Sequence, residues 1–257
     1  MKKLFCFDFD GTLFDHKKRE IPKSAYQALN TLKAQGHLLA IATGRPPVLL
    51  NDLPFDFAFD GMIHTNGRLI IKNQNILAAW YIPTEQIISL INDVTFLGID
   101  IGFQSQFDYV LFSSNHQNVS KFNAHWHIKT PDVDTTYHLN HPILQLVIYS
   151  RLEHISKIIS KYPDLDFFES CPYGIDVHVK GKDKGHGVEI LRKHLKIPHK
   201  DVIVFGDSFN DYEMIQHAHQ SVAMGDAPER IKACATYVTK SAYEDGIYYA
   251  LKSLKYI

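Results

Sequence analysis

The sequence predicts an α/β protein in which a parallel-sheet core is interrupted by an inserted α+β module. Three apolar runs, each too short for a helix, end in polar residues and glycine, as buried strands of a parallel sheet do. These runs cover residues 4–7, 38–42 and 202–205. The spacing of Tyr26, Leu29 and Leu32 predicts a helix between the first two runs. Together they form a strand–helix–strand unit, whose crossover is expected to be right-handed.

The pattern changes between residues 79 and 180, where short strands and helices follow one another without a parallel-sheet rhythm. Turn-forming residues such as Pro172-Tyr173-Gly174 indicate hairpins and antiparallel pairing there. The strands are expected at residues 99–103, 109–113, 143–149, 166–171 and 175–179. The parallel pattern then resumes. We therefore expect a discontinuous core of residues 1–78 and 181–257, with residues 79–180 inserted as an α+β cap.

Three local features of the core have their own predictions. Residues 55–59 are expected to form a further short strand. Asn66-Gly67 is typical of the tight turn of a β-hairpin. Asp226 and Glu229 have the spacing of a capping box at the start of a helix through Ile231.

Composition narrows the class of protein. The chain has 257 residues, of which 45% are hydrophobic, and this is enough for a substantial core. Its formal net charge of −1 gives no electrostatic reason to expect binding to nucleic acid or to an anionic membrane. The chain has an odd number of cysteines, and they are widely spaced: Cys6, Cys171 and Cys234. This pattern is typical of free thiols in a reducing compartment. No apolar run approaches transmembrane length and no signal peptide is evident, so we expect a cytoplasmic protein.

Acids directly follow two of the apolar runs. Asp8 and Asp10 share one side of an extended strand, and two carboxylates that close repel by roughly 4 kcal/mol at an effective dielectric of about 20. Asp207 and Asp211 follow the run at 202–205. One interpretation is two separate acidic turns; the other is a single site, because parallel strands end at the same sheet edge. Four acids there would need a cation, and their oxygen ligands suit Mg²⁺, which also binds substrate phosphate.

Two further residues are candidates for the same edge. Thr43 ends the second run and would leave the sheet beside Asp8. By itself, Thr43-Gly44-Arg45 is equally typical of a helix N-cap followed by a surface arginine. Lys184 lies where the chain re-enters the core, and its alternative interpretation is a solvated lysine in a basic loop.

Taken in order, these motifs resemble those of the haloacid dehalogenase (HAD) superfamily of phosphohydrolases. They are Asp8-Phe9-Asp10-Gly11-Thr12, Thr43, Lys184 and Gly206-Asp207-Ser208-Phe209-Asn210-Asp211. Residues 42–46, Asn66-Gly67 and the place of the insertion look like the superfamily's Cof-type (type IIB) sugar-phosphatase branch. The resemblance implies a Rossmann-like parallel-sheet HAD core with an inserted α+β cap domain. One departure is Asp226, where the family usually has asparagine, and it adds negative charge near the site.

The resemblance also implies roles for these residues. Asp8 would be the nucleophile that forms an aspartyl phosphate, and Asp10 the general acid and base. Mg²⁺ would be bound by Asp8, the backbone carbonyl of Asp10, Asp207 and Asp211. The residues implied for phosphate binding are Thr43, Gly44, Lys184 and Asn210.

The expected substrate is a small phosphorylated metabolite, with sugar phosphates favoured and the cap acting as the selecting lid. Candidate substrate contacts are Arg45, Asn66, Tyr173, Asp176 and His178. Two other functions stay open on the sequence. One is a phosphosugar mutase or a cofactor-phosphate (pyridoxal phosphate or FMN) phosphatase, since one fold serves many reactions. The other is a non-catalytic phosphometabolite sensor.

Overall fold

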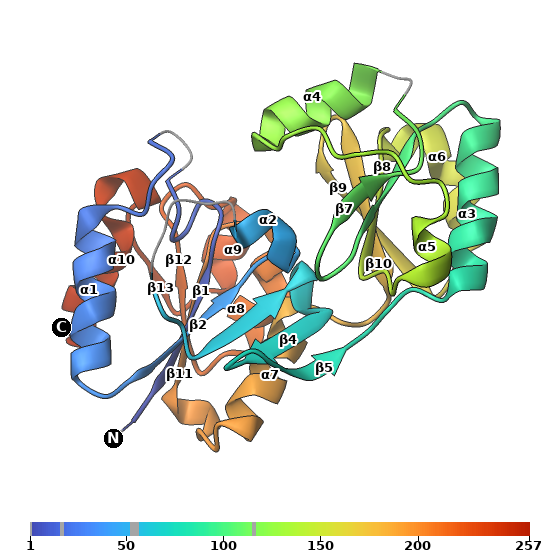
Figure 1. Ribbon diagram of the computed structural model, residues 1–257. Helices are drawn as coiled ribbons and strands as arrows, with labels where there is room; N and C mark the ends of the chain where they lie inside the picture. The colour runs from blue at the N-terminus through green and yellow to red at the C-terminus, as the bar shows by residue number, and fades with distance from the viewer. Residues whose placement is uncertain (1, 16–17, 52–56, 115–116) are drawn as a thin grey trace. The chain divides into compact units, whose positions relative to one another are not determined.

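The computed structural model describes residues 2–15, 18–51, 57–114 and 117–257 (Figure 1). The chain divides into two compact units. Unit 1 comprises Met1–Gly44, Pro54–Ala78 and Lys182–Ile257, and unit 2 comprises Arg45–Leu53 and Ala79–Gly181. The insertion expected at residues 79–180 therefore corresponds to most of unit 2. The difference is the short segment after Gly44, which groups with the insertion because its apolar side chains pack there.

Unit 1 contains an eight-stranded sheet in the order β13-β12-β11-β1-β2-β3-β4-β5. Its strands are β1 Leu4–Asp8, β2 Leu38–Ala42, β3 Gly61–His64, β4 Leu69–Lys72, β5 Asn75–Ala79, β11 Val202–Gly206, β12 Gln220–Ala223 and β13 Tyr237–Val238. The pairs from β13 to β3 are parallel, and β3 pairs with β4 antiparallel. The predicted parallel α/β core is confirmed.

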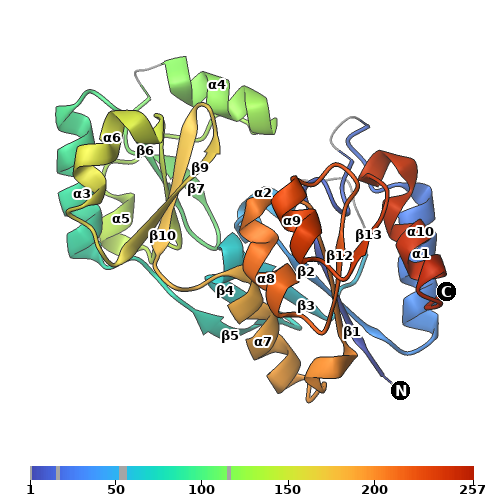
Figure 2. The same ribbon diagram turned by 180° about the vertical axis from the view of Figure 1, so that it is seen from behind.

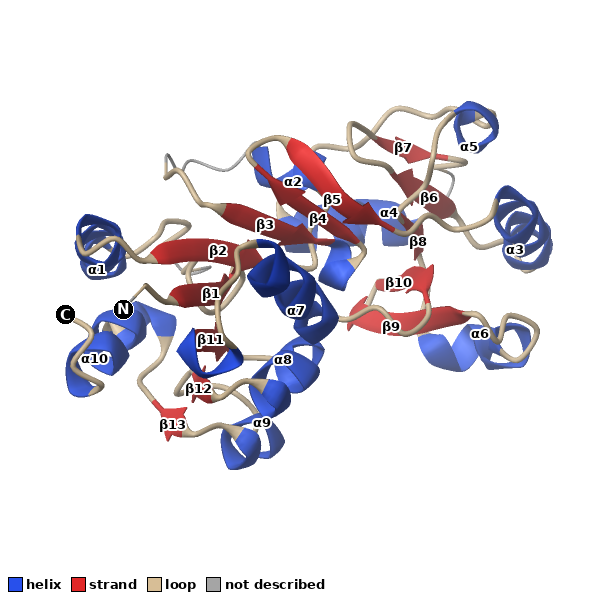
Figure 3. Cartoon of the chain, turned by 90° about the horizontal axis from the view of Figure 1, so that it is seen from below, coloured by secondary structure: helices blue, strands red, loops and turns tan. Residues whose placement is uncertain are grey.

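Helices cover both faces of this sheet. They are α1 Lys23–Ala34, α7 Lys184–His194, α8 Tyr212–His217, α9 Glu229–Cys234 and α10 Gly246–Ser253. Figure 3 shows α1 and α10 on one face and α7, α8 and α9 on the other. The central strands β1 and β11 are buried along their whole length. Because both faces of these strands are covered, their sequences are nearly continuous apolar runs.

Unit 2 contains a five-stranded sheet in the order β7-β6-β8-β10-β9, and its assigned pairs are antiparallel. Figure 2 shows this unit from behind. The strands are β6 Ile101–Gln104, β7 Tyr109–Leu111, β8 Gln145–Ile148, β9 Leu165–Cys171 and β10 Gly174–Val179. The helices are α2 Pro47–Asn51, α3 Thr84–Phe96, α4 Gln117–Trp126, α5 Tyr137–Asn140 and α6 Leu152–Ile159. The predicted antiparallel α+β insertion is confirmed.

The two faces of the unit 2 sheet differ. One carries an aliphatic core with α3 and α6, formed by residues such as Ile87, Leu90 and Ile155. The other carries a smaller cluster of Tyr109, Leu111 and Phe122, against which residues of α2 pack. Period-two alternation along the strands separates the two sets.

Some local predictions fail. The expected strand at residues 55–59 lies partly outside the described residues, and Phe57 and Phe59 have no regular structure; their rings pack together, with Phe57 also against Tyr26. The next strand starts at Gly61 instead. The capping box at Asp226 is also wrong, because Pro228 is the N-cap of α9 and no side chain caps it.

The hairpin at Asn66-Gly67 is confirmed, with its turn formed by the 3₁₀ segment η1 Thr65–Gly67. Further 3₁₀ segments of the same length are η2 His199–Asp201, η3 Phe209–Asp211 and η4 Ala242–Glu244. None of the helices in the described residues combines the length and apolarity needed to cross a membrane.

Candidate active site

Three of the predicted site residues lie at one edge of the unit 1 sheet. Asp8 is the last residue of β1, Thr43 directly follows β2, and Asp207 directly follows β11. Because β1 pairs in parallel with both β2 and β11, the three strands end at the same edge. This edge is where open α/β sheets bind ligands.

An acidic cluster with a buried lysine occupies this edge. Ligand oxygens of Asp8, Asp207 and Asp211 all lie within 4.8 Å of one another. Nζ of Lys184 donates to Oδ1 of Asp8 at 2.5 Å and to Oδ1 of Asp211 at 2.6 Å. The lysine side chain is completely buried. Oδ2 of Asp211 accepts from the backbone N–H groups of Asp207 and Ser208, so this carboxylate is fixed at both oxygens.

The protonation of this cluster is strongly perturbed. Burial and the nearby Asp211 raise the pKa of Asp8 to about 7, although Lys184 opposes the shift. Burial and the charge of Asp8 raise the pKa of Asp207 to about 10. Burial disfavours a charged Lys184, but Asp211 and Asp8 outweigh it and hold the pKa of the ammonium group above its usual value. One lysine thus does not balance three buried or half-buried carboxylates, and the cluster favours an added positive charge.

The donor set fits a hard divalent cation. Oδ2 of Asp8 is buried and has no hydrogen-bond partner among the described residues, so it is available as a ligand. Carboxylate oxygens from three residues, with space left for water and phosphate, are the ligands that Mg²⁺ prefers. The side chain of Asp10 is not part of the group of carboxylates; its implied contribution is through the backbone.

Two residues next to the acids were quoted in the sequence motif without a role. Oγ1 of Thr12, which is buried, donates to Oδ1 of Asp207 at 3.1 Å. Gly11 has φ +87°, and a Cβ there would lie 2.5 Å from Oδ2 of Asp207. The glycine is therefore required both by its backbone conformation and by the close approach of the carboxylate. A glycine directly after Asp10, at the end of the acidic strand, is the signal that could have indicated this contact.

A second group of predicted residues is connected by hydrogen bonds. The buried Thr43 accepts from the backbone N–H of Asn66 through its carbonyl at 2.9 Å. Nδ2 of Asn210 donates to Oδ1 of Asn66 at 3.0 Å. Gly44 lies against the same amide, since a Cβ at this position would be 3.3 Å from Oδ1 of Asn66.

Two contacts of Arg45 lie within unit 2. Its guanidinium carbon lies 6.0 Å from the ring centroid of Trp126 on α4, and Nη1 donates to the carbonyl of Leu49 on α2 at 3.4 Å. Both contacts tie Arg45 to helices of that unit, and its predicted contact with substrate stays a prediction.

The three predicted substrate residues of the insertion lie on or beside β10. Tyr173 is half-buried in the β9–β10 turn, with Nζ of Lys121 5.7 Å from its ring centroid. Asp176 is 9% exposed, and burial raises its pKa to about 7, although the Ser170 hydroxyl partly opposes this shift. His178 is 2% exposed, and its Nε2 lies 2.8 Å from Oε1 of Gln145. Asp176 and His178 share one face of the strand and are largely buried.

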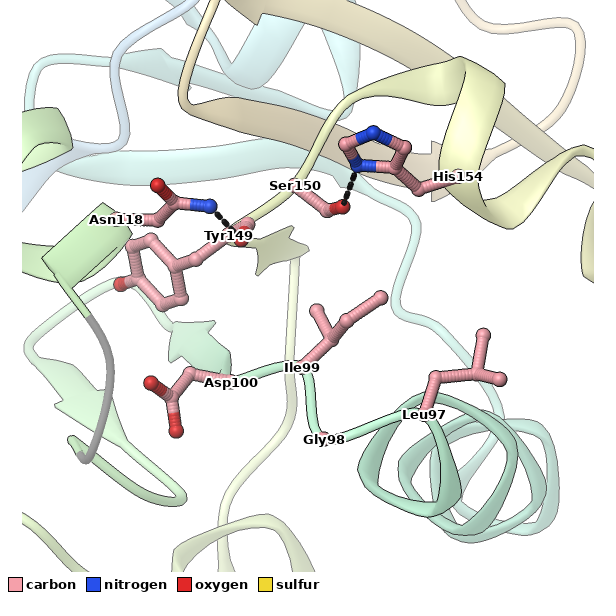
Figure 4. A pocket seen from close by; sticks show the side chains of 8 residues that line it. All are labelled: Leu97, Gly98, Ile99, Asp100, Asn118, Tyr149, Ser150 and His154. Carbon is pink, nitrogen blue, oxygen red and sulfur yellow. Dashed lines mark hydrogen bonds between the residues drawn. The ribbon is translucent and has the colours of Figure 1, made fainter.

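Unit 2 also contains a cavity of about 360 Å³ that includes none of the predicted residues (Figure 4). Its lining residues are Leu97, Gly98, Ile99, Asp100, Asn118, Tyr149, Ser150 and His154. The polar groups are already bonded: Ser113 donates to Asp100, Ser150 contacts His154, and Asn118 donates to the carbonyl of Tyr149.

Comparison with known proteins places this site in a family. The profile of the haloacid dehalogenase-like hydrolases matches residues 5–251. The solved structure of the HAD subclass IIB sugar phosphatase BT4131 is 30% identical, with a TM-score of 0.88 and coverage of 100% of both chains. YkrA of Bacillus subtilis (strain 168), which carries a provisional phosphatase name, is 29% identical over 252 residues, 98% of this chain and 97% of YkrA.

A further relative is 5-amino-6-(5-phospho-D-ribitylamino)uracil phosphatase YitU of Bacillus subtilis (strain 168). It is 24% identical over 267 residues, which are 97% of this chain and 96% of YitU. These relatives are named as enzymes, so the interpretation as a non-catalytic sensor is set aside. The chain belongs to the haloacid dehalogenase-like hydrolase family and is a phosphatase of its Cof-type branch.

Proposed function

We propose that this phosphatase is Mg²⁺-dependent and removes phosphate from small phosphomonoesters, sugar phosphates above all, through an aspartyl phosphate on Asp8. The main support for this proposal is the hydrogen bonding and burial of the Asp8 carboxylate. One oxygen accepts from the buried ammonium group of Lys184, and the other is buried without a hydrogen-bond partner among the described residues. A carboxylate held in this way is oriented and poorly solvated, as a nucleophile should be.

In the first half-reaction, an oxygen of Asp8 attacks phosphorus and the bond from phosphorus to the ester oxygen breaks. Asp10 donates its proton to the departing oxygen, which leaves as an alcohol. The attack requires ionised Asp8, whose pKa is raised by burial and by Asp211; the positive charge of Lys184 opposes this rise. Bound Mg²⁺ would be a second source of positive charge beside Lys184 and would neutralise negative charge on the phosphoryl oxygens.

In the second half-reaction, water attacks the phosphorus of the aspartyl phosphate. Asp10, now ionised, accepts a proton from this water, and the bond between phosphorus and Asp8 breaks to release phosphate. Asp10 is thereby protonated again and ready for the next ester, while Asp8 returns to its carboxylate form.

The remaining core residues hold the metal and the phosphoryl group. Asp8, the carbonyl of Asp10, Asp207 and Asp211 would bind Mg²⁺. Thr43, Gly44, Lys184 and Asn210 would contact the transferring phosphoryl oxygens, because phosphoryl transfer depends mostly on positioning and charge stabilisation.

The inserted unit would select the alcohol part of the substrate. Core residues contact the phosphate that every substrate shares, so discrimination must come from other residues. The polar side chains of Asp176 and His178, with Tyr173 in the adjoining turn, could hydrogen-bond sugar hydroxyls. The similarity to the sugar phosphatase BT4131 supports this class, and the similarity to YitU extends the range to phosphorylated ribityl compounds.

The test is a panel of phosphate esters assayed for released phosphate with and without Mg²⁺, combined with trapping of the intermediate. An acyl phosphate reacts with hydroxylamine, so quenched enzyme should carry a hydroxamate on Asp8 that peptide mass spectrometry locates. Modification at another residue, or none under turnover, would contradict the covalent mechanism. A phosphosugar mutase would instead interconvert isomers with little free phosphate, and a cofactor phosphatase would prefer pyridoxal phosphate or FMN over hexose phosphates.

A further inference from the structure

The turn Thr65–Gly67 has a strained backbone in the interior of unit 1. Its three residues have successive φ values of +50°, +50° and +94°. Thr65 is completely buried and β-branched, a residue type that rarely adopts this conformation. Its Oγ1 has no hydrogen-bond partner among the described residues. Such strain persists only where the surrounding structure holds it, and it is concentrated at functional sites.

The turn contacts three chain segments that carry predicted phosphate-binding residues. The backbone N–H of Asn66 donates to the carbonyl of Thr43 at 2.9 Å. The side chain of Asn66 accepts from Asn210 at 3.0 Å. Gly67 lies directly against the residue before Lys184, because a Cβ at Gly67 would be 2.0 Å from the carbonyl oxygen of Asp183. One turn therefore touches the segments of Thr43, Lys184 and Asn210.

The bond from Asn210 to Asn66 has a particular chemical consequence. Oδ1 of Asn210 accepts from Oγ of Ser208 at 2.5 Å, and Nδ2 donates to Asn66. The amide is thus held at both ends, and its plane and its flip state are fixed. An amide nitrogen carries two hydrogens. One of these hydrogens is donated to Asn66. Because the plane of the amide is fixed, the direction of the second N–H bond is fixed as well.

We propose that Asn66 is a positioning residue that orients the amide of Asn210 toward the phosphoryl group, and that it is not a substrate contact. Its own side-chain oxygen is used by Asn210, and its backbone carbonyl accepts from Nη1 of Arg68 at 2.8 Å. The strained turn keeps Asn66 in place between Thr43 and Asn210. This inference rests on the phosphate-binding role proposed above for Asn210.

A double-mutant cycle separates the two roles. Asn66→Gly removes the amide but keeps the freedom to adopt positive φ. We expect it to lower kcat/KM about tenfold for every phosphate ester alike and to raise the inhibition constant of inorganic phosphate by a similar factor. Asn210→Ala should lose at least as much, and the double variant should be within about twofold of Asn210→Ala, because contacting residues act together.

Asn73→Gly is the matched control. Asn73 also has positive φ, +47°, but lies exposed in the turn between β4 and β5. The same chemical change there should leave kcat/KM unchanged. Thermal unfolding of all variants shows whether a loss of activity follows a loss of fold.

A second pair of variants covers the case in which Asn66→Gly does not fold. Asn66 accepts and Asn210 donates, so Asn66→Asp keeps the bond whereas Asn210→Asp removes the donor. Both add one negative charge at nearly the same place, and we expect Asn66→Asp to keep the higher kcat/KM. Equal losses in this pair, or losses that multiply in the double-mutant cycle, would overturn the positioning role. If Asn210→Ala retained wild-type activity, the phosphate-binding role of Asn210 would fail first, and the inference with it.

Discussion

Nζ of Lys184 lies 2.5 Å from Oδ1 of Asp8, and neither side chain is more than 4% exposed. The same ammonium group lies 2.6 Å from Asp211. A lysine is rarely buried completely unless it is paired, and this one bridges two carboxylates from distant parts of the chain. The interaction links the end of β1 to the start of α7 and to η3, so it contributes to the fold as well as to the site.

Lys184→Met should therefore destabilise the protein and abolish turnover. Removing one partner of a buried ion pair leaves uncompensated charge and costs about 3–5 kcal/mol, part of which protonation of Asp8 relieves. The free energy of unfolding in urea measures the first effect and kcat the second. Lys193→Met is the control, since Lys193 is on the same helix with a side chain 67% exposed. A variant as stable as the control would show that the pair contributes nothing net to folding.

Asp8→Asn should remove turnover without unfolding the protein. The amide has the shape of the carboxylate but is no nucleophile, so kcat should fall by roughly three orders of magnitude or more. Circular dichroism checks the fold, and Asp132→Asn makes the same change at an exposed aspartate. A variant that kept a tenth of the wild-type kcat would rule out covalent catalysis by this residue.

The positions of these acids could be predicted from the sequence because local and global rules agree there. Asp8, Thr43 and Asp207 each follow an apolar run, and neighbouring parallel strands necessarily end together. The strain at Thr65 could not be predicted, because a β-branched residue disfavours positive φ and only its tertiary surroundings hold it there. The sequence likewise contains no signal that Arg45 contacts Trp126, a residue far along the chain.

At Phe57 and Phe59 the sequence predicts a strand, but these two residues have no regular structure. Their composition favours a strand, but their rings pack against each other with centroids 4.8 Å apart. Side-chain packing overrides strand propensity at this point. In the inserted unit, turn-forming residues at the hairpins predicted the antiparallel sheet. The burial of Asp176 and His178 could not be predicted, because it depends on tertiary packing that the sequence pattern does not show.

Chelation should remove activity reversibly. Ligand oxygens of Asp8, Asp207 and Asp211 converge within 4.8 Å, and three carboxylates with one lysine leave an excess of negative charge. Dialysis against EDTA should reduce phosphate release to background, and added Mg²⁺ should restore it, whereas Ca²⁺ should restore less because its preferred coordination is larger and looser. Undiminished hydrolysis after thorough chelation would contradict a metal-dependent mechanism.

Asp176→Asn should change how stability depends on pH. Burial raises the pKa of Asp176 to about 7 from its ordinary value of 3.8, and Ser170 only partly opposes this. The native state therefore binds this proton more tightly than the unfolded state does. The associated stability is present below pH 3.8 and is lost as pH rises through about 7, by up to roughly 4 kcal/mol.

The asparagine variant cannot ionise, so its free energy of unfolding relative to wild type should rise between pH 4 and pH 8. Urea denaturation at these two pH values measures the difference. Asp132→Asn again serves as the control, because its carboxylate is exposed. A constant difference between wild type and Asp176→Asn across this range would show that folding does not raise the pKa of Asp176.

Conservative changes in the inserted unit should alter substrate preference more than chemistry. Asp176 and His178 are buried, so Asp176→Asn and His178→Gln preserve packing while changing hydrogen bonding, and Tyr173→Ala removes the half-buried ring. If these side chains bind the sugar, kcat/KM for a hexose 6-phosphate should fall about tenfold or more. The value for p-nitrophenyl phosphate should stay within about twofold, since its leaving group offers no hydroxyls to bind. Tyr81→Ala, at a 37% exposed tyrosine of the same unit, should affect neither substrate. Equal losses for both substrates would mean that these residues support the structure of the unit and that the alcohol is selected elsewhere.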